Sequence, residues 1–165
     1  MLDDSDTFQT REWICGGVDK LLESKNNSAI LGFIIISCGI DLLAGYWKGG
    51  ETKGRDYKDF LKQDIDFPKK YEPEGIYNSL RCGLVHNFTI HGGIYALTWG
   101  HPEYHLKRTQ TGQQFINLED FYQDFRKLME NLFDQIKTDA SLQKKFIKRH
   151  KKLGILVQRD TLLVT

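Results

Sequence analysis

The chain is poor in the residues that mark secreted, repetitive or linker-rich proteins. It has three prolines and three cysteines in 165 residues. The cysteines, Cys15, Cys38 and Cys82, are odd in number, lie far apart and form no C-x-x-C pair, which predicts a reduced, cytoplasmic protein. The first ten residues are acidic where a secretory signal would be basic, so export is not expected. With no repeat and no Pro/Ser-rich linker, residues 1–165 are expected to form one domain.

A strong net charge is also missing, and so are two familiar motifs, one that binds phosphate and one that carries a nucleophilic serine. The 23 Lys and Arg residues nearly balance the 22 Asp and Glu residues, so the formal net charge of +1 does not indicate a dedicated nucleic-acid binder. No G-x-x-x-x-G-K-[ST] loop and no G-x-S-x-G elbow occurs, and no cofactor is expected. The charge is nevertheless uneven. Residues 1–80 carry 10 basic and 14 acidic side chains, whereas residues 81–165 carry 13 and 8, so a polyanion would meet the second half.

One apolar run, residues 28–47, is about as long as a membrane-spanning helix. It contains Asp41, and an acid inside a membrane helix costs about 2.5–3.5 kcal/mol. Its three glycines also dilute its hydrophobicity. The run therefore favours a buried helix and no membrane, with a membrane-associated protein as the alternative. In the buried helix Asp41 needs a partner, because an isolated buried carboxylate is far too costly.

Apolar residues at helical spacing predict helices on both sides of this run. The N-terminal helix is expected over residues 8–24, with Thr7 as its N-cap. Two more helices are expected, over 55–65, ended by the Phe67–Pro68 step, and over 74–86.

The second half mixes short strands with long helices. Residues 89–118 are short β-branched and aromatic runs separated by Gly and Pro, which predicts two or three small strands. Asn117 is expected to cap a long helix, with Asp120 completing a capping box, and a last helix is expected over 139–153. The apolar tail 154–165 would add a strand or pack on a partner. The predicted architecture is a mainly α bundle with a small β-hairpin or short sheet inserted after the 74–86 helix.

Two residues in the 74–86 helix point to phosphate chemistry. Arg81 is a permanent cation whose planar fork suits phosphate, and His86 can take and give a proton near neutral pH. Together they could cleave a phosphodiester without a metal, and RNA is the natural substrate because its 2′-hydroxyl is an internal nucleophile. On a regular helix, five residues at about 100° each leave the two side chains about 140° apart. Both would reach one phosphate only if the helix ends near His86 or a second subunit contributes, so a homodimer is expected.

An arginine followed four to six residues later by a histidine, near the end of an apolar helix, resembles the HEPN superfamily. The segments IDLLAGYW, DFLKQDIDFPKKY and IYNSLRCGLVHNF look like a group of prokaryotic HEPN-like proteins, and the similarity covers about residues 28–90. The resemblance implies a helical domain that acts as a dimeric, metal-independent endoribonuclease in toxin–antitoxin or antiviral systems. It makes Arg81 and His86 the catalytic candidates, and it implies an antitoxin or other protein as a partner. The superfamily also contains inactive members, so a binding or scaffold domain is the alternative.

Three neighbouring residues support this pair in different ways. Asp41 is expected to pair with Arg81, either as a purely structural contact or as one that positions a catalytic arginine. Cys82 stands where the family commonly has a polar residue, often asparagine. Asn87 is interpreted as a helix terminator or as an active-site amide. If the pair is only structural, His86 caps the helix C-terminus, where the helix dipole favours a cation.

Two further clusters complete the candidates. The spacing of Cys82 with His86 and of His101 with His105 suggests zinc, but Pro102 and the strand-like surroundings of the latter pair argue against it, and no metal site is expected. The basic run KKFIKRHKK could hold RNA backbone, or it could be a solvated helix end whose charge suits the dipole. Its candidate RNA-binding residues are Lys144, Lys145, Lys148, Arg149, Lys151 and Lys152.

Overall fold

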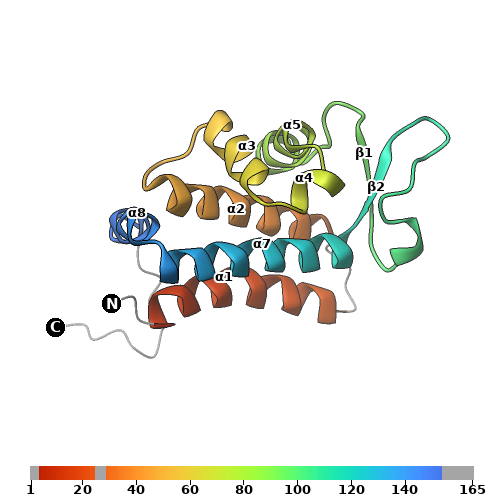
Figure 1. Cartoon of the computed structure of the whole chain (residues 1–165). Helices are drawn as coiled ribbons and strands as arrows, with labels where there is room; N and C mark the ends of the chain where they lie inside the picture. The colour runs from red at the N-terminus through yellow and green to blue at the C-terminus, as the bar shows by residue number, and fades with distance from the viewer. Residues whose placement is uncertain (1–3, 25–28, 154–165) are drawn as a thin grey trace.

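Helices make up most of the chain, which is described here from a computed structural model covering residues 4–24 and 29–153 (Figure 1). The prediction of a mainly α fold with a small sheet is confirmed. The predicted tail 154–165 lies outside the described residues. In chain order the elements are α1 (Asp4–Glu23), α2 (Ala29–Lys48), α3 (Gly54–Gln63), α4 (Phe67–Lys70), α5 (Pro73–Gly75), the π-helix η1 (Ile76–Leu84), α6 (Val85–Asn87), β1 (Tyr95–Thr98), the 3-10 helix η2 (Pro102–Tyr104), β2 (Gln114–Asn117), α7 (Leu118–Thr138) and α8 (Ala140–His150).

The apolar helix α2 lies in the middle of the bundle. Figure 1 shows α1 and α7 along one side of α2 and the shorter helices α3 to α5 on the other, while β1 and β2 project from one end and α8 lies at the opposite end. Ile36, Ile40 and Leu43 of α2 are completely buried. Gly39 lets two helices approach closely, because a Cβ there would lie 2.8 Å from the Phe125 ring and 3.0 Å from Ile14. Within the described ranges, α2 alone is long and apolar enough to cross a membrane, and 56% of its most apolar window is buried.

The long helix α7 supplies the other large part of the core. Five of its apolar residues step by four, three, four and four along the sequence, a spacing that predicts one packing stripe on a helix. All five are buried: Phe121, Phe125, Leu128, Leu132 and Ile136. The predicted capping box at its start is wrong, since no side-chain hydrogen bond caps the helix at Asn117. The Asn117 amide instead donates to Asp120 (2.7 Å), and its Oδ1 accepts from the N–H of His101 (3.2 Å). The Asn117 side chain therefore holds the β excursion instead of capping α7.

Two other predicted boundaries are wrong. Helix α1 already begins at Asp4, so Thr7 lies inside it, where its hydroxyl accepts a hydrogen bond from Arg11 (2.7 Å). The Phe67–Pro68 step does not simply end the preceding helix. It begins α4, with Pro68 in the first turn, where the missing N–H costs nothing.

The small sheet is parallel, so the predicted hairpin is wrong but the predicted short sheet is present. Strand β1 pairs with β2 with Tyr95 opposite Gln114 and Thr98 opposite Asn117. Parallel pairing requires the chain to return to the same end, and η2 lies in that connection. An isolated antiparallel bridge joins Arg108 to Gln114 on the other edge of β2.

A half-buried histidine network fastens this excursion to the bundle. His105 Nδ1 accepts from the N–H of Asn117 (3.1 Å), so its Nε2 carries the proton and donates to the Tyr71 hydroxyl (3.0 Å). Tyr71 donates to Asp124 (2.8 Å), whose second oxygen accepts from Lys70 (2.6 Å). The tyrosine is 1% exposed, and burial together with Asp124 raises its pKa far above its usual value. The Tyr71 hydroxyl therefore keeps its proton at neutral pH.

Acidification is expected to weaken this network. Burial lowers the pKa of His105 below its usual value of about 6.5, although Asp120 and Asp124 oppose the shift. At a pH between the pKa of His105 in the folded chain and its pKa in the unfolded chain, the unfolded chain binds the proton and the folded chain does not. The free energy of unfolding therefore falls as the pH falls through that window. Urea unfolding at pH 7.5 and 5.5 should show a larger loss for the wild type than for His105→Gln. Equal losses would show that this histidine does not carry the effect.

Candidate active site at the Arg81–His86 helix end

The predicted 74–86 helix is continuous, but its middle is wider than an α-helix. It begins with Pro73 in α5, continues as the π-helix η1 and ends in α6. In a π-helix each N–H bonds to the carbonyl five residues earlier, and the N–H of Val85 reaches the carbonyl of Leu80 in this way. Residues five apart therefore share a face, which an α-helix does not allow. Arg81 and His86 are five apart.

This widening brings the two candidate residues together within one chain. Nη1 of Arg81 lies 3.0 Å from Nε2 of His86. The expectation that they point about 140° apart is wrong, because it assumed regular α-helical rotation throughout. A second subunit is consequently not needed to bring this arginine and this histidine together.

Asp41 of the apolar helix α2 anchors the arginine, as predicted. Nε of Arg81 donates to Asp41 Oδ2 at 2.9 Å, and Nη2 lies 2.8 Å from the same oxygen. The two side chains are 22% and 24% exposed. Burial disfavours the arginine's charge, but hydrogen bonding to Asp41 and its charge outweigh that cost and raise the pKa of Arg81. The guanidinium is thereby held as a cation in a fixed orientation.

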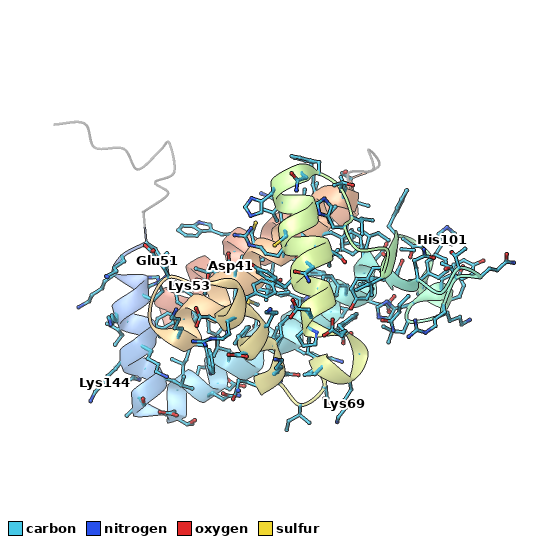
Figure 2. The ribbon with its side chains drawn as sticks, turned by 90° about the horizontal axis from the view of Figure 1, so that it is seen from above. Asp41, Glu51, Lys53, Lys69, His101 and Lys144 are labelled. Carbon is cyan, nitrogen blue, oxygen red and sulfur yellow. The ribbon has the colours of Figure 1, made fainter. Side chains whose placement is uncertain are left out.

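The loop after α2 completes the anchor. The hydroxyl of Thr52 donates to Asp41 Oδ1, the oxygen that Arg81 does not use. Figure 2 shows Asp41 near the loop that carries Glu51 and Lys53, and far from His101 in the β excursion. Both oxygens of the carboxylate are therefore occupied, one by each of two segments packed against α2.

The contact with arginine fixes the state of the histidine. A guanidinium has only donors, so Nε2 of His86 must accept, and the imidazole is neutral with its proton on Nδ1. The side chain is exposed at the helix end, whereas the arginine lies half-buried beneath it. The pair therefore presents a neutral proton acceptor and a fixed cation to the solvent.

The other two candidates in this segment, Cys82 and Asn87, contact residues of the same helix. Cys82 is half-buried and free of a disulfide. A hydrogen bond with its thiol, together with burial, raises the pKa of Tyr77. The Asn87 amide donates to the carbonyl oxygen of Cys82 (3.4 Å), which supports its interpretation as a helix terminator. Tyr57, which carries no motif, is fully buried, and its hydroxyl has no hydrogen-bond partner among the residues that the structure describes.

The basic residues of α8 form a separate surface. Lys144, Lys145 and Lys148 are exposed on the helix, and Lys151 and Lys152 are exposed just after it. Figure 2 shows Lys144 at the edge of the molecule, away from Asp41. Arg149 is different: it is half-buried, and its Nε lies 3.2 Å from where a Cβ on Gly45 would be. Within residues 4–24 and 29–153, no hydrogen bond or ion pair joins these side chains to Arg81 or His86.

His101 and His105, the second pair with zinc-like spacing, have different partners. His101 pairs with Glu103 (3.1 Å), whereas His105 bonds to Tyr71. In the part of the chain that the structure describes, no group of three or more His, Cys, Asp or Glu side chains is arranged to hold a metal ion.

Thr52 is the main member of the site that sequence reasoning missed. It lies in a Gly-rich loop, eleven residues after Asp41, and carries no motif of its own. The one available signal was the Asp41 carboxylate itself, whose second oxygen also needed a donor.

The chain reversal after His86 depends on a glycine, and this dependence can be measured. A Cβ on Gly83 would collide with the carbonyl oxygen of Thr89 and lie 3.0 Å from the N–H nitrogen of His91. Gly83→Ala should therefore destabilise the protein by about 1–3 kcal/mol, lowering the melting temperature by about 2–4 °C per kcal/mol. Gly50→Ala is the matched control, because a Cβ there meets nothing within 4 Å. Equal melting temperatures for the two variants would contradict this packing.

No family model, no curated protein and no solved structure matches this chain.

Proposed function

We propose that this protein is a metal-independent endoribonuclease of the HEPN type, acting as a cytoplasmic homodimer, with Arg81 and His86 as its catalytic residues. One observation carries the proposal. The arginine, fixed by Asp41, lies 3.0 Å from an imidazole exposed at a helix end. A permanent cation beside a proton acceptor suits a reaction in which a proton leaves a hydroxyl while negative charge grows on a phosphoryl group.

The geometry suggests how RNA would engage the pair. In the free protein the lone pair of His86 Nε2 is occupied by Nη1 of Arg81. A phosphodiester carries one negative charge, shared by its two non-bridging oxygens, and such an oxygen forms a stronger hydrogen bond with the guanidinium than a neutral imidazole does. A bound phosphate would therefore take Nη1 and release Nε2 of His86. The released nitrogen then accepts the proton of the 2′-hydroxyl as its oxygen attacks phosphorus and the bond from phosphorus to the 5′-oxygen breaks. The imidazolium so formed returns that proton to the departing 5′-oxygen.

The surface beside the pair supports a homodimer. Leu31, Ile35 and Cys38 follow one another at steps of four and three along α2, with Leu31 39% exposed and Cys38 exposed. Cys38 precedes Asp41 by three residues, about one turn of the same helix, so the Cys38 end of this stripe lies close to the ion pair. A symmetric contact through the stripe would bring two copies of the pair to one groove.

The exposed lysines of α8 would contribute to holding the RNA backbone, a contribution that falls as salt concentration rises. A cognate antitoxin or another protein is the further partner that the HEPN resemblance implies.

A catalytically inactive binding or scaffold domain is the second candidate. The observation that favours it is the extent to which Arg81 is already engaged. Nε and Nη2 bond to Asp41, and Nη1 bonds to His86. An arginine used in this way stabilises the fold whether or not RNA ever binds.

Cleavage of mixed single-stranded RNA in the presence of a chelator separates the two candidates. The wild type should cleave, and His86→Ala should lose about 10²–10⁴-fold in rate, the usual contribution of a general acid or base. His91→Ala is the matched control, since His91 is also exposed and belongs to the same half of the chain. It should cleave like the wild type. Equal and negligible cleavage by all three proteins at micromolar concentration would favour the binding domain.

The oligomeric state is a separate prediction. Sedimentation should give twice the chain mass of 19.2 kDa. Leu31→Glu places a charge on the exposed apolar stripe and should shift the protein towards the monomer, with a parallel fall in RNA cleavage. Glu12→Gln, on the exposed surface of α1, is the control and should leave the mass unchanged. A wild type that sediments at the chain mass would contradict the homodimer.

A further inference from the structure

Phe88, two residues after His86, combines two unfavourable features. The residue is 67% exposed, the largest exposed fraction among the described phenylalanines. Its backbone has φ 53° and ψ 30°, the left-handed conformation that a residue with a Cβ rarely adopts. At the end of a helix this position is usually glycine, because glycine adopts the conformation without steric cost. Neither feature improves the stability of the folded chain.

The backbone around Phe88 is held firmly in this conformation. Its N–H donates to the carbonyl of Leu84 (3.0 Å), and the N–H of Thr89 donates to the carbonyl of Gly83 (3.3 Å). The next segment is tied down as well, since the Ser79 hydroxyl donates to the carbonyl of His91 (2.7 Å). The aromatic ring is therefore presented to the solvent from a fixed backbone at the end of η1 and α6.

Phe88 also lies close in the chain to the candidate catalytic pair. Residues two apart have Cα atoms at most about 7 Å from each other, so Phe88 and His86 both project from the same short helix end. The neighbouring groups are a cation and an imidazole, which suit a phosphate. An exposed aromatic face beside a phosphate-binding group is the arrangement with which proteins stack an unpaired nucleobase.

We infer that Phe88 is the stacking platform for an unpaired nucleobase of the RNA adjoining the scissile phosphate. The inference rests on the proposed nuclease function and adds to it a requirement for single-stranded substrate. The stack would hold one nucleotide while Arg81 binds its phosphate. Because every base has a π face, it would select unpaired over paired RNA and select little among the four bases.

Binding of an uncleavable probe tests this inference apart from catalysis. The probe is a short, fluorescein-labelled, single-stranded 2′-O-methyl RNA of mixed sequence, which lacks the attacking hydroxyl, and its affinity is measured by fluorescence anisotropy at fixed low salt. Phe88→Gly should weaken binding about 5- to 150-fold, the loss expected for one base stack. Phe88→Trp should bind like the wild type, because the indole also stacks.

The same glycine variant supplies a structural control. Glycine relieves the left-handed strain, so Phe88→Gly should melt at or above the wild-type temperature, and weaker binding would not reflect unfolding. Unchanged affinity in Phe88→Gly, with RNA cleavage by the wild type intact, would overturn the stacking role and leave the nuclease proposal standing. A wild type that neither binds nor cleaves RNA would overturn both. Loss of the dimer in Phe88→Gly would overturn the stacking role by assigning the ring to a protein contact.

Discussion

The ion pair between Asp41 and Arg81 is the contact on which the candidate site depends. It joins the middle of the most apolar helix to the π-helix, and neither charge is freely solvated. Removing one partner of such a pair leaves the other charge in a poorly solvated place, which is far more costly than never having had the pair. The same contact orients the guanidinium, so Nη1 points at His86. One interaction therefore satisfies a structural requirement and arranges the residues that suit phosphate chemistry.

The π-helix determines whether the anchored Arg81 lies next to His86. If η1 were an ordinary α-helix, Arg81 could still reach Asp41, but His86 would face elsewhere. The wider turn moves residues five apart onto one face, and π-helical segments in other proteins are often found at functional sites for related reasons. Gly83 then lets the following chain cross close to the helix. Position, orientation and exposure of the imidazole all follow from this short segment.

The β excursion is attached to the bundle by polar contacts as well as by the buried side chains of Tyr95 and Ile116. Its half-buried histidine bonds to a buried tyrosine, and Asn117 uses its amide to hold the loop before η2. An excursion fastened in this way is sensitive to protonation at its attachment point. The Arg81–His86 pair lies on a different part of the bundle. Protonation at the attachment point of the excursion therefore need not disturb the contact between Arg81 and His86.

The sequence by itself determined the helical architecture, the packing stripe of α7 and the need of Asp41 for a partner. These follow from local periodicity and from the cost of an isolated charge, and both are properties of the chain read in order. It also brought forward Arg81 and His86 as residue types suited to phosphate. Tertiary structure alone decided that the two meet, that Thr52 completes the anchor and that Phe88 is exposed in a left-handed conformation. The physical reason is that a π-turn and a loop contact depend on backbone hydrogen bonds and close packing, which leave no periodic signal in the residues.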